Sequence, residues 1–516
     1  MKIPFISRGS LDRGTQLLLL FAGIKLAIHF YTNAFAGYGI FRDELYYVAC
    51  SDHLSAGYVD QPPLSIFLLA LNRLFLGSSI FALRFLPAVA GAATVFLTGL
   101  MARELGGGRF AQAVAALASI VSLIFLGYDA IFSMNAFDVL CWAWCAYVLI
   151  LLVKTGDKKY WLYLGFLLGL GLLNKIDVLW LGFGILVGVA LTSERRWLKT
   201  EYPYIAGFIA FAFFLPYIIW NATHAGAHLE FIHNASGVKY SSLTPRIFLI
   251  GQLLLQNPVT IPLWLSGLVV FLFSKTERRY RLLAFVYLTT IAILLINGHS
   301  KPEYSASAYS MLFAGGAVGI ERWTSHKFLR WLKPLYFAVV ASGIVLAPLV
   351  LPILPVETYI RFADALGVAP TTPEGKKLDK LPQFYADMFG WEDKAAAVAR
   401  IFHSLSPDDQ KKCAIFADNY GRCGAIDFYS EKYNLPKSIG PHNNYWIWGP
   451  RDYTGELVLV LGGDLKGKTD RFESVTIADT VRSKYAMPYE NNLPIYICRH
   501  LKVPLKQVWP SLKHFE

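Results

Sequence analysis

Residues 132–153 read FSMNAFDVLCWAWCAYVLILLV, an apolar run of 22 residues with a single charged side chain, Asp138. An α-helix needs about 20 apolar residues to cross the hydrocarbon core of a bilayer, so this run predicts a membrane span. Ten further runs along the chain have a similar character, which gives about 11 expected spans. The runs are residues 17–37, 80–102, 110–126, 132–153, 161–173, 176–191, 204–220, 247–273, 282–296, 306–320 and 335–351.

The composition of the 516 residues agrees with this interpretation. Hydrophobic residues make up 55% and charged residues 16%, whereas a soluble globular protein is about one quarter charged. A disordered chain, a coiled coil and an ordinary cytosolic enzyme are therefore excluded. The net charge of +12 does not indicate nucleic acid as a partner, because residues 1–352 hold 27 of the 48 Lys and Arg but only 16 of the 36 Asp and Glu. The excess lies in the loops of the apolar part.

The loop charges also predict an orientation. With a cytoplasmic N-terminus, 19 of those 27 basic residues fall on the cytoplasmic side, as the positive-inside rule requires. The prolines 258 and 262 predict a kink in the eighth run. An odd number of spans places the C-terminus outside the cytoplasm, and residues 17–37 are interpreted as a retained signal anchor.

The composition changes near Pro352, where a proline-rich linker leads into a segment of balanced charge. We expect two domains, a transmembrane domain over residues 1–352 and a small α/β soluble domain outside the cytoplasm over residues 353–516. Alternating apolar stretches predict strands at residues 413–417, 457–462, 475–480 and 494–498, and a helix at 421–433. The six cysteines predict at most one disulfide outside the membrane, with Cys413 and Cys423 as the nearest candidates.

The densest polar cluster follows the first run. It reads YGIFRDELYYVACSDH over residues 38–53 and GYVDQPPL over residues 57–64. Adjacent carboxylates beside a membrane are costly unless they bind something, so Asp43 and Glu44 are candidate functional residues. The alternative is that both cap and solvate an interfacial helix, with Arg42 as a partner.

Three further polar clusters occur on the same predicted side of the membrane. Asp138 enters an apolar run, and an ionisable residue in that position is a functional candidate unless a loop cation pairs with it. The clusters are residues 129–138, with Asp129, Asn135 and Asp138; residues 174–177, with Lys175 and Asp177; and residues 297–304, with His299, Lys301 and Glu303. Together with the cluster at residues 38–64, these three predict one wet cavity that opens outward, whose carboxylates and lysines suit a substrate with both a hydroxyl and a phosphate.

Other chemistry is weakly indicated. His224 and His228 have the His-x3-His spacing of a zinc site, but loop histidines are usually only solvated. Glycines 106–108 lack the Lys-Ser/Thr of a phosphate-binding loop, and no serine nucleophile elbow is present. A metal is therefore not expected to be required, although a divalent ion remains an alternative.

These motifs resemble those of the bacterial GT-C glycosyltransferases, a group that includes protein O-mannosyltransferases and the lipid A aminoarabinose transferase. The resemblance rests on residues 41–64, 133–142, 169–175 and 301–309, which occur in the family's order, and it covers nearly all of residues 10–325. It implies a GT-C-like membrane fold in a bacterial inner membrane, with a catalytic face outside the cytoplasm. It also implies transfer of a sugar from a polyprenyl-phosphate carrier.

Carried onto this sequence, the resemblance implies Asp43 as the catalytic acidic residue with Glu44 beside it, and Asp138 as a second acidic position for which Asn135 or Asp129 are alternatives. The implied substrate-binding residues are Tyr46, Tyr47, Asp60, Lys175, Lys301 and His299. One difference is that Asp60-Gln61 stands where the aminoarabinose branch has Glu-Lys, which argues against a simple assignment to that branch.

The expected reaction is transfer to an acceptor hydroxyl of a lipid, glycan or protein, with inversion and with Asp43 as the base. A positioned base contributes about 10²–10⁴-fold, and lysines aimed at the departing phosphate stabilise its charge. The alternatives are a transporter or flippase of a lipid-linked sugar or glycan, which would more often show inverted repeats, and a membrane-anchored binding protein.

Overall fold

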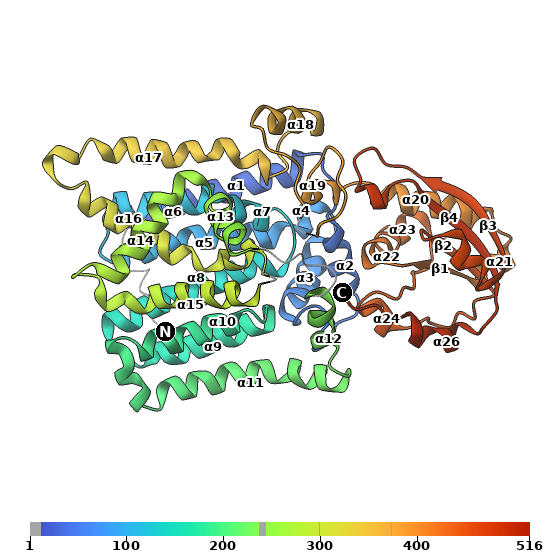
Figure 1. Cartoon of the computed structure of the whole chain (residues 1–516), viewed down its shortest axis with the longest axis horizontal. Helices are drawn as coiled ribbons and strands as arrows, with labels where there is room; N and C mark the ends of the chain where they lie inside the picture. The colour runs from blue at the N-terminus through green and yellow to red at the C-terminus, as the bar shows by residue number, and fades with distance from the viewer. Residues whose placement is uncertain (1–11, 237–243, 299, 373) are drawn as a thin grey trace. The chain divides into compact units, whose positions relative to one another are not determined.

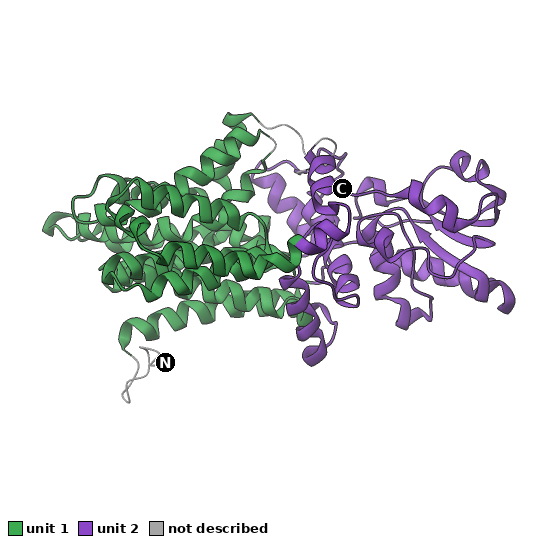
Figure 2. Ribbon diagram, turned by 90° about the horizontal axis from the view of Figure 1, so that it is seen from below, with its two compact units in different colours: residues 1–36, 81–218, 242–354 green, residues 37–80, 219–241, 355–516 purple. Residues whose placement is uncertain are grey.

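The computed structural model describes residues 12–236, 244–298, 300–372 and 374–516. These residues form two compact units, each drawn from three segments of the chain (Figure 2). The first unit comprises the described parts of Met1–Ala36, Phe81–Ile218 and Ser242–Leu354. The second comprises those of Gly37–Ile80, Ile219–Ser241 and Pro355–Glu516, so it joins two short segments to the C-terminal part of the chain.

The first unit is a helical bundle. Figure 1 shows α8, α9, α10 and α15 running side by side, and the contacts of α8 with α9 and of α10 with α15 agree with this arrangement. Its helices are α1 (Arg13–Phe35), α5 (Phe85–Glu104, led into by α4, Ile80–Leu83), α6 (Arg109–Val121), α7 (Leu123–Asp129), α8 (Met134–Thr155), α9 (Lys159–Asn174), α10 (Val178–Ala190), most of α11 (Tyr202–Thr223), α13 (Pro245–Leu255), α14 (Ile261–Phe273), α15 (Arg281–Asn297), α16 (Ser310–Trp323) and α17 (Leu332–Ser342).

Small residues allow these helices to approach closely, as is usual where lipid supplies no hydrophobic drive for helix association. Helix α14 packs along α16, and a Cβ atom added at Gly316 would lie 1.9 Å from the carbonyl oxygen of Leu263. Only glycine fits at this crossing. The interior is otherwise filled by Ala, Val and Leu side chains of α5, α6, α8 and α16.

Among the described residues, six helices are long and apolar enough to cross a membrane, or up to nine if each of three bent helix pairs is one span. The predicted count of 11 is therefore not confirmed. The two remaining runs form α9 and α16, which have 16 and 14 residues and are shorter than a straight span. The kink predicted in the eighth run is present, because α13 and the helix from Pro258 to Phe273 meet at 90°. The chain is a multi-pass membrane protein.

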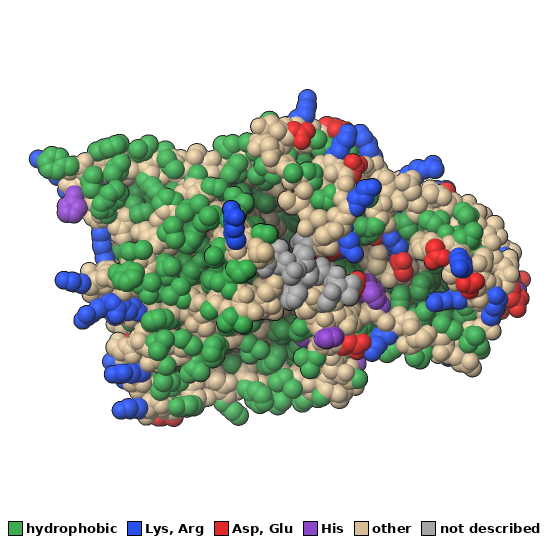
Figure 3. Space-filling view, viewed as in Figure 1, with side chains coloured by type: hydrophobic (Ala, Val, Ile, Leu, Met, Phe, Trp, Pro, Cys, Tyr) green, Lys and Arg blue, Asp and Glu red, His purple; other side chains and the backbone are tan. Residues whose placement is uncertain are grey.

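Basic side chains gather at one end of the first unit, while its flanks are largely hydrophobic (Figure 3). Contacts between loops identify this end. Lys154 lies 2.9 Å from Glu104, and Arg322 lies 2.7 Å from Glu277. Arg322 also donates a hydrogen bond of 3.4 Å to the backbone carbonyl of Leu105, which joins the two pairs. The loops that follow α5, α8, α14 and α16 therefore lie at the same end of the bundle, as the predicted cytoplasmic side requires.

The second unit contains a four-stranded sheet in the order β1-β2-β4-β3. The pair β1–β2 is parallel, and the other pairs are antiparallel. All four predicted strands and the predicted helix are confirmed, and all six cysteines of the chain are free. The strands are β1 (Cys413–Ala417), β2 (Leu457–Leu461), β3 (Phe472–Val481) and β4 (Leu493–Leu501).

Helices of the second unit cover the sheet and connect it to the N-terminal segment of the same unit. Helix α20 packs on β3, α22 on β1, and α2 on α22. A Cβ atom added at Gly424 of α22 would lie 2.9 Å from Leu45 of α2, so this contact needs glycine. The helices are α2 (Arg42–Ser51), α3 (Leu64–Leu76), α12 (Ala227–Asn234), α18 (Val356–Ala365), α19 (Gln383–Ala386), α20 (Trp391–Ser404), α21 (Pro407–Lys412), α22 (Tyr420–Phe428), α23 (Ser430–Tyr433), α24 (Asn444–Trp448), α25 (Leu465–Thr469) and α26 (Leu505–Val508).

Candidate active site

Helix α2 holds the two adjacent carboxylates, and it gives them different surroundings. Oε2 of Glu44 accepts a hydrogen bond of 2.8 Å from the backbone N–H of Phe41, the residue before the helix. This bond satisfies one of the free N–H groups that every helix start leaves. Glu44 is only 1% exposed. Its carboxylate therefore stabilises the start of α2, as the capping interpretation expects.

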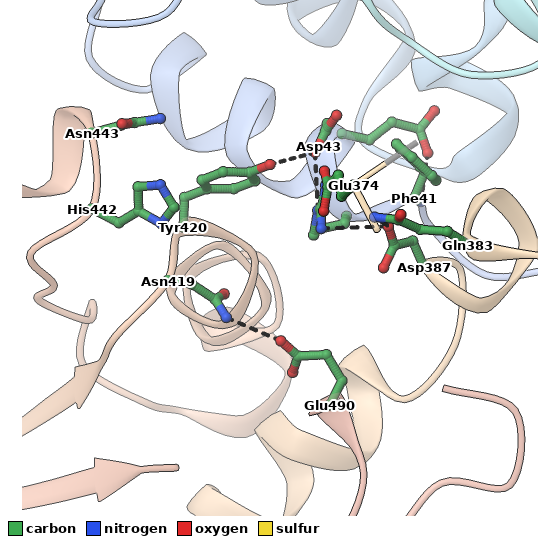
Figure 4. Close-up of polar contacts among 12 residues, drawn as sticks. Phe41, Asp43, Glu374, Gln383, Asp387, Asn419, Tyr420, His442, Asn443 and Glu490 are labelled. Carbon is green, nitrogen blue, oxygen red and sulfur yellow. Dashed lines mark hydrogen bonds and ion pairs between the residues drawn. The ribbon is translucent and has the colours of Figure 1, made fainter. Parts of the chain in front are cut away.

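Asp43 remains accessible. Its side chain is 37% exposed, and its Oδ1 accepts a hydrogen bond of 2.9 Å from the hydroxyl of Tyr420 in α22. Arg42 Nε donates to the same oxygen at 3.3 Å. Within the described parts of the chain, Oδ2 has no hydrogen-bond partner. Figure 4 shows the Tyr420 hydroxyl directed at Asp43. One oxygen of Asp43 is thus fixed, and the other can accept a proton.

Arg42 lies at the centre of a polar network of carboxylates and tyrosines. We call this network the Arg42 cluster, and it consists of Arg42, Asp43, Glu374, Asp387, Tyr420 and Tyr489. The guanidinium lies 3.0 Å from Glu374 and 3.5 Å from Asp387, and it donates to the Tyr489 hydroxyl at 2.9 Å. Burial opposes the charge of Arg42, but the surrounding carboxylates raise its pKa above the ordinary value.

The carboxylates of this cluster outnumber its cation, and one of them is strongly perturbed. Asp387 is 1% exposed, and burial raises its pKa to about 7 although Arg42 acts in the opposite direction. Its Oδ1 has no hydrogen-bond partner within the described residues. Asp387 therefore changes its charge near neutral pH, next to the arginine that holds Asp43.

The predicted binding residues Tyr46, Tyr47 and Asp60 lie in the same unit. The Tyr46 hydroxyl lies 3.0 Å from Oδ1 of Asp60 and 2.9 Å from Oδ1 of Asn444. Tyr46 and Tyr47 are both buried, and Asp60 is partly exposed. The loop before Pro62 is therefore tied to α2 and to the start of α24, and Asp60 is the one member of this group that a substrate could reach.

The two histidines considered for zinc bind backbone carbonyls. Nδ1 of His228 lies 2.9 Å from the carbonyl oxygen of Val59, and Nδ1 of His224 lies 2.8 Å from that of Trp220. No group of three or more His, Cys, Asp or Glu that could hold a metal occurs among the described residues. The structure thus gives these histidines a place in loop packing.

A second cluster, the Asp138 cluster (Asp138, Lys175, Asp177 and Ser307), lies in the first unit. Lys175 Nζ lies 2.7 Å from Asp177 and 3.6 Å from Asp138. The hydroxyl of Ser307 donates to Oδ2 of Asp138 at 2.5 Å. Asp138 is 1% exposed. The lysine therefore lies between two carboxylates. This agrees with the alternative that Asp138 is paired with a loop cation.

The remaining predicted positions are distributed around the first unit. Asp129, an alternative to Asp138, forms a buried ion pair of 2.8 Å with Lys25 of α1. Asn135 is partly buried in the first turn of α8. Lys301 is partly buried at the start of η5 (Pro302–Ala308), and His299 lies outside the described residues. Asp129 is thus paired with Lys25, and Lys301 is partly exposed to solvent.

The structure therefore joins Asp138 to Lys175 in one unit, and Asp43 to the Arg42 cluster in the other. Sequence reasoning missed Glu374, Asp387, Tyr420 and Tyr489 because all four come from the C-terminal segment, more than 300 residues after Asp43. The one available signal in the sequence was Arg42 itself, a cation with apolar neighbours beside a membrane span. Such a cation needs buried anions as partners.

Comparisons with known proteins place this geometry in context. The sequence model of the family described as dolichyl-phosphate-mannose-protein mannosyltransferase matches residues 60–220, a segment that contains Asp138 and Lys175 and begins after Asp43. No curated protein matches the chain. ArnT from Cupriavidus metallidurans in the apo state is 12% identical with a TM-score of 0.64, and the match covers 98% of this chain and 100% of that chain. ArnT bound to undecaprenyl phosphate is 11% identical with a TM-score of 0.63, covering 94% and 98%.

At this level of identity the ArnT structures show a shared fold. The family match over residues 60–220 and the shared fold make this chain similar to glycosyltransferases of the GT-C superfamily. These similarities favour a glycosyltransferase over the transporter and binding-protein alternatives.

Proposed function

We propose that the enzyme transfers a sugar from a polyprenyl-phosphate carrier to an acceptor hydroxyl at the outer face of the membrane. The observation that carries the proposal is Asp43, a carboxylate with one fixed and one accessible oxygen, located a few residues after the first membrane span. The similarity in fold to ArnT, which was solved with undecaprenyl phosphate bound, supports the class of donor. The acceptor is a lipid, a glycan or a protein.

In the proposed mechanism Asp43 acts as the general base. Oδ2 takes the proton of the acceptor hydroxyl while Tyr420 and Arg42 hold Oδ1. The acceptor oxygen then forms a bond to the anomeric carbon as the bond from that carbon to the carrier phosphate breaks, and the phosphate keeps the electron pair. A direct displacement of this kind inverts the anomeric centre.

Lys175 and Lys301 are the proposed cations for the carrier phosphate. Cations that stabilise charge developing on a leaving group lower the barrier without reorganising. Lys175 is already paired with Asp177 and Asp138, so a phosphate must compete with these carboxylates for its N–H groups. Lys301 precedes η5 and is partly exposed.

The proposed transfer reaction does not require a metal ion. A carrier phosphate is already a fair leaving group, and two lysines can neutralise it. Turnover should therefore persist after dialysis against a chelator. Loss of turnover that Mg²⁺ or Mn²⁺ restores would establish a divalent ion as an additional requirement.

We further propose a bacterial inner membrane location with a cytoplasmic N-terminus and an external C-terminus. The basic end of the first unit supports this orientation. A fusion after Glu516 tests it: alkaline phosphatase should be active there, and a green fluorescent protein should stay dark. The reverse result would require a different number of spans.

The direct test of the function uses purified enzyme in nanodiscs with polyprenyl-phosphate sugars labelled in the sugar. Transfer releases the free carrier phosphate and moves the label to an acceptor extracted from the cell envelope. Carrier release that depends on the acceptor supports the proposal. Movement of an intact lipid-linked sugar across proteoliposomes without cleavage would instead indicate a flippase.

A further inference from the structure

The sheet of the second unit has a cavity on one face. It measures about 220 Å³, and its apolar lining includes Phe416, Val458, Val460, Phe472, Leu501 and Leu505. Helix α25, which follows β2 and has five residues, contributes Gly467 and Lys468 to the lining.

One charged side chain in the lining is buried. Lys468 of α25 is 9% exposed, and its Nζ lies 4.3 Å from the centre of the Tyr496 ring. Nζ donates one hydrogen bond of 3.0 Å, to the backbone carbonyl of Asp464. The Asp464 carboxylate accepts the N–H of Gly467 and caps the helix. Within the described residues Lys468 therefore has no carboxylate partner, and two of its three N–H donors have no acceptor.

A buried ammonium without a counter-ion is unfavourable. Burial lowers the pKa of Lys468, because desolvation penalises the charged form, although the charges of Asp464 and Asp418 act in the opposite direction. Arg471, which also lines the cavity and is exposed, adds a second positive charge. The cavity thus combines apolar walls with a buried ammonium, while Asp464, a carboxylate in the same lining, accepts the N–H of Gly467.

We propose that this cavity binds a small organic anion whose apolar body fills the space over β1 and β2 and whose carboxylate or phosphate pairs with Lys468. An engineered cavity of about 150 Å³ holds benzene. A cavity of about 220 Å³ therefore accommodates one aromatic ring with a short side chain. The class of ligand is an arylalkanoic acid or an aryl phosphate of that size.

The binding test uses the full-length enzyme in nanodiscs and 3-(4-fluorophenyl)propionate observed by ¹⁹F NMR, with empty nanodiscs as a blank. We expect saturable binding that weakens at least tenfold in Lys468→Met, which keeps the length of the side chain without its charge. Lys466→Met, an exposed position of the same helix, should bind as the wild type does. Lys468→Arg should restore binding. The uncharged alcohol 3-(4-fluorophenyl)propan-1-ol should bind at least tenfold more weakly, and 4-fluorophenyl phosphate decides between the two head groups.

Thermal unfolding separates this site from a structural role for the lysine. If Lys468 serves a ligand, Lys468→Met should melt no lower than the wild type, and the probe should raise only the melting temperature of the wild type. If the lysine only holds Tyr496 and Asp464 in place, Lys468→Met should melt lower and the probe should have no effect on either protein. Equal binding to Lys468→Met, equal binding of the alcohol, or an absence of saturable binding would each overturn the proposal.

Discussion

The Arg42 cluster and the Asp138 cluster contain the same kinds of residue but differ in access. In the Arg42 cluster one arginine meets three carboxylates, and Asp43 remains 37% exposed. In the Asp138 cluster one lysine meets two carboxylates, and Asp138 is 1% exposed. The first arrangement offers a proton acceptor to a substrate, and the second is a buried ion pair that must open before it can act.

This difference separates catalysis from stability. An accessible carboxylate loses little stability when it is neutralised, because water solvates either form. A buried pair from which one partner is removed leaves an uncompensated charge, which is strongly destabilising. Substitutions in the two clusters should therefore affect different measurements, and each of the following experiments tests that separation.

The largest effect is expected at Asp43. Asp43→Asn keeps an oxygen that can accept the Tyr420 hydrogen bond but removes the base, so the rate of transfer should fall about 10²–10⁴-fold. The melting temperature should change little. Carrier release from a labelled donor measures the rate. Asp408→Asn, an exposed carboxylate in the same unit, is the matched control and should leave the rate unchanged. Full turnover in Asp43→Asn would move the role of base to another carboxylate.

The second prediction concerns Lys175. Lys175→Met leaves Asp138 and Asp177 buried without their cation, so we expect a loss of about 3–5 kcal/mol in stability. Thermal unfolding in nanodiscs measures it. Lys159→Met removes an exposed pair with Asp157 and should cost at most about 1 kcal/mol. A Lys175→Met protein that is stable but binds the donor weakly would show that the lysine faces a phosphate more than its carboxylates.

Much of the fold could be predicted because a helix that crosses lipid needs a long run of apolar residues. Each apolar run became helical, as a single helix or as two helices with a bend between them, and alternating stretches such as residues 457–462 became strands. The number of spans could not be predicted from length alone. Residues 247–273 form two helices at 90°, and the runs in α9 and α16 are too short to be counted by the same criterion.

The site could be predicted only where its members are close in sequence. Asp43 and Glu44 were identified together, but the cap formed by Glu44 depends on the backbone of Phe41 and on burial by other segments. Tyr420 and Asp387 could not be found, because no sequence pattern relates them to Arg42. Lys175 and Asp177 were grouped because they are close in sequence, but the second carboxylate, Asp138, reaches the lysine only through the packing of α8 against α9.

The third prediction uses the titration of Asp387, which lies beside Arg42 in the Arg42 cluster. Burial raises its pKa to about 7 from an ordinary 3.8. Between about pH 4 and 7 the folded state therefore binds more protons than the unfolded state, and this contribution to stability is lost as the pH rises through 7. In Asp387→Asn the side chain at position 387 is neutral at every pH, so the variant does not lose this contribution to stability as the pH rises. Relative to the wild type, the variant should gain about 2–3 kcal/mol between pH 5 and pH 8. Thermal unfolding at the two pH values measures the gain, and parallel curves for the two proteins would contradict it.

The smallest effect is expected at Tyr420, which acts on the reaction through Asp43. Tyr420→Phe keeps the ring that packs on Tyr46 and removes the 2.9 Å hydrogen bond to Oδ1 of Asp43. A hydrogen bond to a charged group contributes about 1.5–3 kcal/mol, but Arg42 still holds the same oxygen, so we expect kcat to fall about 5- to 20-fold. KM for the donor should stay constant, because the hydroxyl orients the base and does not touch the carrier. Tyr489→Phe is the matched control: it removes a hydroxyl from Arg42 and leaves the Tyr420–Asp43 bond in place. Equal losses in the two variants would mean that the tyrosines support the arginine, whereas a loss confined to Tyr420→Phe places the C-terminal segment in the orientation of the catalytic base.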